Sequence, residues 1–209
     1  MKKLAIILVV CLAVTMSLFG CGSNPTPTET ADTFLNAVKA GDADTLKTVY
    51  EGDNFDVLAL LFDDVESDGG DAVDDEYFEK TLTPLLQDFD YKLSNEKIDG
   101  DKATVDVKIT TYDIGGAFLA FMEDYFGQAL ELAFSGASDK EVEELANSIF
   151  EEKINKLTDK DYSETVTLDL VNKDGIWKVT KIDESSELIN AISGNMIKAI
   201  EEIDEAFDE

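Results

Sequence analysis

The spacing of apolar residues changes along the chain, and these changes constrain the fold more than any single motif. Between residues 30 and 89 apolar side chains recur every three or four positions, as in a helix with one buried face. Across 91–109 and 165–179 they recur every second position, which is typical of half-buried strands. The predicted fold class is therefore α+β, with N-terminal helices packed on a curved antiparallel sheet of about four strands.

Local signals set the expected helix ends in the first third of the chain. Gly41 follows the first helical segment as a C-cap, and Asp42 precedes the second as an N-cap. Pro84 must kink the fourth segment or start a new helix capped by Thr83. The expected helical segments are residues 30–40, 43–50, 55–62 and 76–89.

Two strand hairpins are expected, each with one buried face. The first turns at residues 99–101, where a glycine stands between two aspartates, and the second turns at residues 172–175. The inward positions of the two hairpins are Tyr91, Leu93, Val105, Val107 and Ile109, and Val166, Leu168, Leu170, Trp177 and Val179.

A helical insertion, residues 115–160, separates the hairpins. Its first helix carries two adjacent apolar stripes, and Ser138 with Glu141 forms a capping box that opens the second. Either the two helices form an antiparallel hairpin packed on the sheet, the favoured interpretation, or the aromatic first helix lines an apolar pocket. The stripes are Phe118, Phe121, Tyr125, Ala129 and Leu132, and Leu119, Met122, Phe126, Leu130 and Ala133.

The C-terminal residues 183–209 are expected to form one amphipathic helix. Its apolar residues follow alternating steps of three and four, from Ile189 to Ala206, with Gly194 inside. Such a seam packs on its own domain or on another helix. Because it spans under three heptads, packing on its own domain is favoured.

The N-terminus reads as an export signal. Lys2 and Lys3 precede an apolar run that ends at Gly20 and Cys21. The alternative is an uncleaved membrane anchor, but residues 4–19 are fewer than the roughly 20 that a spanning helix needs. The segment resembles the lipobox of bacterial lipoproteins. That resemblance implies removal of residues 1–20, lipidation of Cys21, and a chain anchored by lipid on the extracytoplasmic face of a cell membrane.

Residues 21–29 are expected to be a lipidated cysteine and a flexible tether. Pro25 and Pro27 stand there among small polar residues. At about 3.3 Å per residue this tether reaches some 25 Å, enough to hold the domain just off the bilayer.

Composition excludes several classes of function. The formal net charge is -29, with 46 acidic and 17 basic residues, so a nucleic-acid partner is not expected. Histidine and arginine are absent, which removes the commonest general base, the commonest zinc ligand and bidentate anion clamps. Cys11 leaves with the signal, so no thiol remains for a disulfide. No cofactor is expected, and solubility is the favoured explanation of the acidity.

Two segments resemble nuclear transport factor 2-like domains. Residues 33–42 read TFLNAVKAGD, similar to the opening helix of that family, and residues 170–179 read LVNKDGIWKV, similar to its closing hairpin. The resemblance covers residues 30–112 and 162–182. It implies a domain over 30–182, folded as a cone of helices against a curved sheet. Small lipoproteins of Gram-positive bacteria often carry such domains, so the resemblance also implies a Gram-positive bacterium as the source. The insertion 115–160 departs from the family pattern, and it either plugs the mouth of the cone or extends it.

Three functional hypotheses follow. The first is a non-catalytic binding module for a small apolar ligand or a protein partner. Cavities are common in the cones of the family, and the candidates for lining one here are Phe55, Phe118, Tyr125 and Trp177. The second hypothesis is an isomerase-like enzyme, as in some relatives. Without histidine its base must be a buried carboxylate of raised pKa, and the chain has too many carboxylates to select one. Asp113, just after the second strand, and Tyr112 are two of the candidates.

The third hypothesis is calcium binding by the acidic residues 64–75. Asp64, Glu66, Asp68 and Asp75 occupy positions 1, 3, 5 and 12 of a calcium-loop pattern, with Gly69 at position 6. Glutamate at position 3 and aspartate at position 12 depart from that pattern. A solvated acidic loop is the favoured interpretation of the segment.

Overall fold

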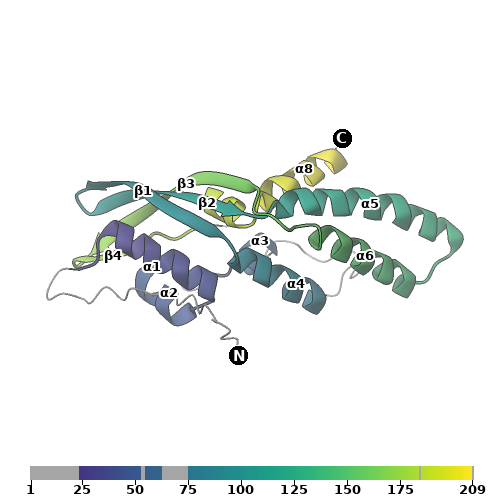
Figure 1. Cartoon of the computed structure of the whole chain (residues 1–209), viewed down its shortest axis with the longest axis horizontal. Helices are drawn as coiled ribbons and strands as arrows, with labels where there is room; N and C mark the ends of the chain where they lie inside the picture. The colour runs from purple at the N-terminus through teal and green to yellow at the C-terminus, as the bar shows by residue number, and fades with distance from the viewer. Residues whose placement is uncertain (1–23, 53–54, 63–74, 184, 209) are drawn as a thin grey trace, which may run out of the picture.

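The structure is a computed structural model that describes residues 24–52, 55–62, 75–183 and 185–208. Figure 1 shows an elongated molecule in which helices cover one antiparallel sheet, and the predicted α+β class is confirmed. The elements are α1 (Pro27–Ala40), α2 (Ala43–Val49), α3 (Val57–Phe62), α4 (Asp75–Gln87), β1 (Asp90–Asp99), β2 (Lys102–Thr111), α5 (Ile114–Ser135), α6 (Asp139–Ile154), β3 (Tyr162–Lys173), β4 (Ile176–Val179), α7 (Glu187–Ile192) and α8 (Met196–Asp208).

The four strands lie in the order β1-β2-β3-β4, and all three pairs are antiparallel. Val107 of β2 pairs with Leu93 of β1 and with Val166 of β3, so inward residues of neighbouring strands share one face. The buried residues of β2 and β3 lie on that face, while Lys108, Thr165 and other polar residues lie on the exposed one. The predicted alternation is confirmed.

Helix α1 packs on the apolar face of the sheet, in contact with β1, β2 and β4. It begins at Pro27, because Thr26 and Glu29 form a capping box, and it ends at the expected C-cap Gly41, whose φ is 62°. The expected tether over residues 21–29 is therefore too long, since its last three residues are helical. Asn24 also donates a side-chain hydrogen bond to the carbonyl of Gly175 (2.6 Å), at the turn between β3 and β4.

Helix α4 runs through Pro84 as one element. Of the two alternatives at Pro84, a new helix capped by Thr83 is therefore wrong. Pro84 is exposed, whereas Leu82 and Leu86 on either side of it are buried, so its ring lies on the solvent side of the helix.

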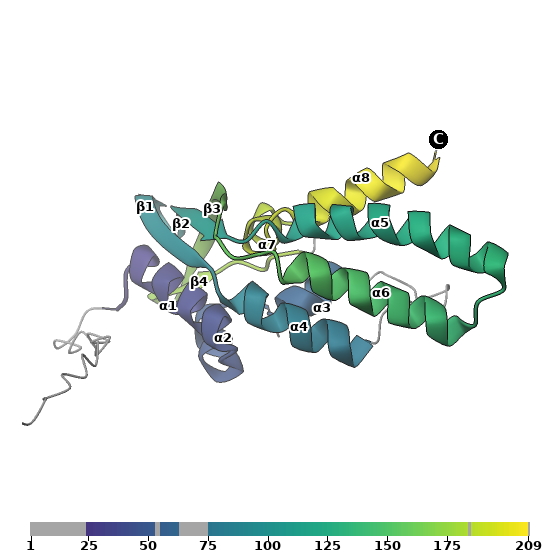
Figure 2. The ribbon, with the colours of Figure 1, turned by 45° about the vertical axis from the view of Figure 1, so that its right-hand side comes forward.

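Helices α5 and α6 form an antiparallel hairpin, opened at α6 by the predicted capping box of Ser138 and Glu141. The prediction that this hairpin packs on the sheet is wrong. Figures 1 and 2 show it continuing the long axis of the molecule beyond the end of the sheet. Its own core joins the helices, and Phe121 of α5 meets Phe150 of α6 edge to face at 5.6 Å between ring centroids.

The C-terminal segment is two helices rather than one. The chain breaks at Gly194 (φ 60°) and Asn195 (φ 71°), which lets α7 pack on β2 and β3 while α8 turns onto α5. Ile189, Met196 and other residues of the predicted seam are buried, so packing on its own domain is confirmed. Among the described residues no helix combines the length and the apolarity needed to cross a membrane.

Two glycines let the break approach the start of α5. The N–H of Gly115 donates to the carbonyl of Gly194 (2.8 Å), and a Cβ on Gly194 would lie 1.9 Å from the carbonyl oxygen of Tyr112. We expect Gly194→Ala to lower the free energy of unfolding by at least about 3 kcal/mol, from backbone strain plus the clash. Urea denaturation of the parent and the variant measures this change in the free energy of unfolding.

Gly127→Ala is the matched control, because Gly127 lies within α5, and an added Cβ would have no atom within 4 Å apart from its chain neighbours and the backbone of its own helix. It should raise stability by about 0.5–1 kcal/mol. Equal effects of the two substitutions would contradict the close packing described at the break.

Candidate functional site

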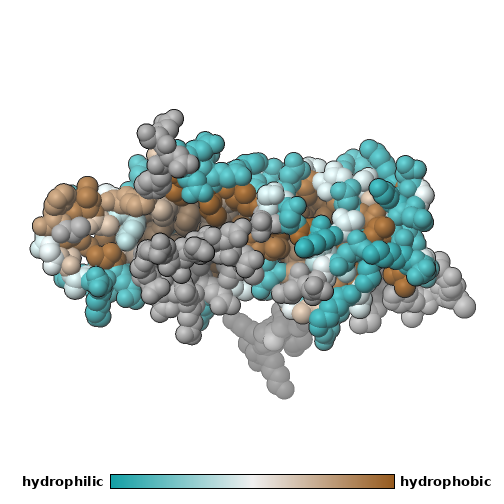
Figure 3. Space-filling model, turned by 180° about the vertical axis from the view of Figure 1, so that it is seen from behind, coloured by the Kyte–Doolittle hydropathy of each residue, from teal (hydrophilic) through white to brown (hydrophobic). Residues whose placement is uncertain are grey.

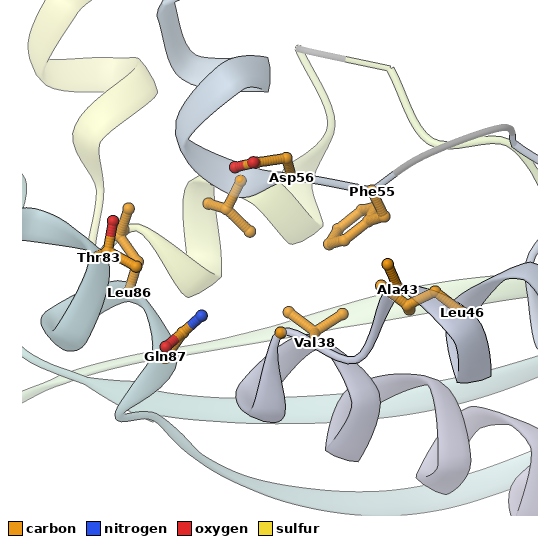
Figure 4. A pocket seen from close by; sticks show the side chains of 10 residues that line it. Val38, Ala43, Leu46, Phe55, Asp56, Thr83, Leu86 and Gln87 are labelled. Atoms are coloured by element: carbon orange, nitrogen blue, oxygen red, sulfur yellow. The ribbon is translucent and has the colours of Figure 1, made fainter. Parts of the chain in front are cut away.

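The candidate site is a pocket of about 200 Å³ beside the C-terminal end of α1. Figure 4 shows side chains from α1, α2, the approach to α3 and α4 converging on it. Its lining residues are Val38, Gly41, Ala43, Leu46, Phe55, Asp56, Val57, Thr83, Leu86 and Gln87.

The large apolar side chains of the lining are nearly buried, whereas Ala43 and Asp56 are exposed. Phe55 is held by two other rings, at 5.0 Å from Phe34 and 5.5 Å from Tyr50 between centroids. Tyr50 is fixed in turn, since its hydroxyl accepts the backbone N–H of Ile182 (2.9 Å). The aromatic cluster therefore fixes one wall of the pocket, and the other apolar walls are Val38, Leu46, Val57 and Leu86.

The polar groups of the pocket come from α4 and from the segment before α3. Gln87, the last residue of α4, directs its side-chain amide into the pocket (Figure 4). A Cβ on Gly41 would lie 3.1 Å from Nε2 of Gln87, so glycine at the C-cap leaves room for that amide. Thr83 and Asp56 complete the lining. This arrangement suits an apolar group that makes one or two hydrogen bonds.

The structure does not bring the four predicted ligand residues together. Phe55 lines the pocket, whereas Phe118 and Tyr125 stack with Phe121 along α5, at 6.1 and 5.7 Å between centroids. Trp177 lies half-buried on β4, opposite Asn172. Phe118 and Tyr125 thus belong to the packing of the helical hairpin.

The predicted calcium residues Asp64, Glu66 and Asp68 lie outside the described residues. Asp75 is the first residue of α4. Within the described ranges no three acidic or cysteine side chains are grouped as a metal would need. The calcium loop therefore stays a prediction.

Tyr112 and Asp113, the candidates for enzyme chemistry, make separate local contacts. The Tyr112 hydroxyl donates to Asp88 (2.8 Å), a hydrogen bond that raises the pKa of Tyr112. Lys160, also bonded to Asp88 (2.7 Å), and Tyr112 lower the pKa of that carboxyl. Asp113 accepts the N–H of Gly116 (3.1 Å) at the start of α5. The hydrogen bonds of Asp88 thus join Tyr112 and Lys160, and Asp113 caps the start of α5.

A polar network that the sequence did not reveal joins β3 to the C-terminal helices. Glu164 accepts hydrogen bonds from the Tyr162 hydroxyl (2.6 Å), the Asn190 amide (3.1 Å) and the Lys198 ammonium (3.2 Å). Burial opposes the charge of Glu164, but these three donors together hold its pKa below the usual range. Burial, then the bond to Glu164, raises the pKa of Tyr162. The sequence held one sign of this network: Glu164 stands two residues before Val166, so the strand alternation places it on the apolar face of the sheet.

Comparisons with known proteins place the chain in no family. No protein-family model and no curated protein matches it. It resembles the crystal structure of a provisionally classified lipoprotein (ycdA) from Bacillus subtilis subsp. subtilis str. 168, at 16% identity and a TM-score of 0.42. The match covers 81% of this chain and 48% of that one, so this chain spans about half the length of the neighbour. Similarity at this level carries neither a fold assignment nor a function.

The Glu164 network predicts a pH-dependent contribution to stability. A carboxyl whose folded pKa is lowered stabilises the fold above its unfolded pKa, and this stabilisation is lost as the pH falls through the folded pKa. We expect Glu164→Gln to lower the free energy of unfolding by about 1–2 kcal/mol at pH 7. The difference from the parent should vanish at acid pH, measured by urea denaturation across pH.

Asp169→Asn is the control, on the exposed face of the same strand. It should leave the pH profile unchanged. A Glu164→Gln deficit that persists at the lowest pH at which both chains fold would contradict the account.

Proposed function

We propose that the protein is a lipid-anchored binding module on the extracytoplasmic face of a cell membrane, with no chemistry of its own. The pocket beside α1 is its ligand site. The observation that carries this proposal is a small cavity in which five of the six apolar side chains, all except Ala43, are each at most 7% exposed, with the amide of Gln87 directed into it. Concave sites that combine buried apolar side chains with a few polar groups are typical of small-molecule binding.

The size and charge of the pocket define the ligand class. An engineered apolar cavity of roughly 150 Å³ holds a benzene molecule, so this one accommodates one aromatic ring or a branched chain of similar size. The Gln87 amide supplies a hydrogen bond, and Asp56 disfavours an anion at the mouth. The net charge of -29 acts in the same direction. The ligand is therefore a neutral or cationic molecule with one small apolar group.

Support for the anchor comes from the sequence around Cys21 and from the position of Asn24. Only three peptide units separate Cys21 from Asn24, so the two residues are at most about 10 Å apart. Asn24 is hydrogen-bonded to the β3–β4 turn at Gly175. Lipid on Cys21 holds this end of the sheet close to the bilayer.

A divergent nuclear transport factor 2-like domain is part of the same proposal. The segment 33–42 forms most of α1 with its C-cap, and the segment 170–179 contains the end of β3, the turn and β4. Helix α1 packs against β4, which brings the two resembling segments together.

Benzyl alcohol, one ring with one hydroxyl, is a probe of suitable size. The chain from residue 22 onward keeps every described element. In this chain, we expect the alcohol to shift the methyl NMR signals of Val38, Leu46, Val57 and Leu86, because these side chains line the pocket. Ala43→Phe at the pocket lining should weaken binding at least about tenfold, or 1.4 kcal/mol.

Ala40→Phe is the matched control, an exposed alanine of α1 outside the lining. It should bind as the parent does. Shifts that scatter over the surface, or equal loss in both variants, would show that this pocket is not the ligand site.

A further inference from the structure

The second half of α5 exposes a row of large apolar side chains. Phe126, Leu130 and Phe134 are 45%, 60% and 85% exposed. They are spaced by four residues, so they lie along one face of the helix, here called the α5 ridge. Figure 3 shows apolar side chains gathered at the end of the molecule that the α5–α6 hairpin forms, on the left of that view. Exposed apolar stretches of this kind mark interaction surfaces.

Within the described part of the chain, the helices packed on α5 leave Leu130 and Phe134 exposed. On one side α6 packs through Phe150, and α8 begins beside Gly115, at the other end of α5 from the ridge. With 22 residues α5 is about 33 Å long, and Figure 2 shows it continuing past the end of α8. The distal part of the hairpin is thus a pair of helices with room for a third beside the ridge.

The chain that follows the ridge, from the end of α5 into the start of α6, is acidic, and this charge selects the partner. Residues 130–144 carry five carboxylates and one lysine, and that lysine, Lys140, pairs with Glu144 (2.7 Å). Two such ends repel each other, which disfavours a second copy of the chain, and they also repel an anionic lipid surface. A cationic rim around an apolar stripe complements them.

The size of the ridge fits a short helix. Taking about 200 Å² for an exposed phenylalanine, the three side chains offer on the order of 400 Å². A stable interface needs about 800 Å² per partner, so charged contacts must supply the rest. From Phe126 to Phe134 the ridge spans about 12 Å, which three turns of a partner helix cover.

We propose that the α5 ridge docks a cationic amphipathic helix of a partner protein, which completes the α5–α6 hairpin as a third helix. The partner buries an apolar stripe on Leu130 and Phe134 and places lysines or arginines beside the carboxylates of residues 131–144. This site is separate from the pocket beside α1. The two proposals therefore stand or fall independently.

A synthetic helix of leucine and lysine, with leucine at helical spacing, is the probe, and its leucine–glutamate counterpart is the charge control. Fluorescence anisotropy with the chain from residue 22 onward should show saturable binding of the lysine peptide alone. Leu130→Ser with Phe134→Ser should weaken it at least about tenfold, or 1.4 kcal/mol. Both side chains are exposed, so circular dichroism should show unchanged helix content.

Ile98→Ser with Ile176→Ser is the matched control, because these side chains are 56% and 52% exposed on the sheet. This pair and Ala43→Phe in the pocket should both leave peptide binding within twofold of the parent. If the ridge variant and this control variant weaken peptide binding equally, the proposal is overturned, because the binding is then a general attraction between opposite charges. A dimer of the chain, or binding to anionic vesicles, that Leu130→Ser with Phe134→Ser abolishes would also overturn it.

Discussion

A sheet with one apolar face must be covered along its whole length, and the rest of the structure depends on this constraint. Strands β2 and β3, of 10 and 12 residues, extend over roughly 33 Å or more. Helix α1, with 14 residues, is about 21 Å long, so it cannot cover that face alone. Helix α7 packs on β2 and β3 and completes the cover with Ile189 and Ile192 fully buried.

The position of α7 in turn sets the direction of the helices that follow and precede it. Glu164 on β3 holds Asn190 and Lys198 across the break in the C-terminal segment, and Gly194 lets that break touch the backbone before α5. Helix α8 then packs on the start of α5 and leaves the rest of the hairpin to extend beyond the sheet. The molecule therefore has two ends, one beside Asn24 and one carrying the α5 ridge.

Local signals made much of the fold predictable. The helix caps at Gly41 and Ser138 depend only on neighbouring residues, and their prediction was confirmed. The strand alternation depends only on one buried face, and its prediction was confirmed too. The single C-terminal helix was wrong because the left-handed backbone at Gly194 is set by contact with Tyr112, far away in the chain. The prediction that the α5–α6 hairpin packs on the sheet was wrong for a similar reason, because an apolar stripe does not indicate which surface of the protein covers it.

The candidate site was predictable only in part. Phe55 was named because it is aromatic, but Phe118, Tyr125 and Trp177 share that property and lie elsewhere. The Gln87 amide and the Glu164 network carried no motif, since each depends on elements that meet only in the folded chain.

The central claim is that lipid on Cys21 holds the sheet end near the membrane and the α5 ridge away from it. Without Cys11 and with Cys21 acylated, the chain has no other thiol, so Ile176→Cys and Phe134→Cys each accept one dye. Energy transfer from that dye to labelled lipid headgroups on cells or vesicles carrying the acylated protein measures each distance. The account predicts strong transfer at position 176, weak transfer at position 134, and none at either in Cys21→Ala. Equal or stronger transfer at position 134, or transfer that survives Cys21→Ala, would contradict it.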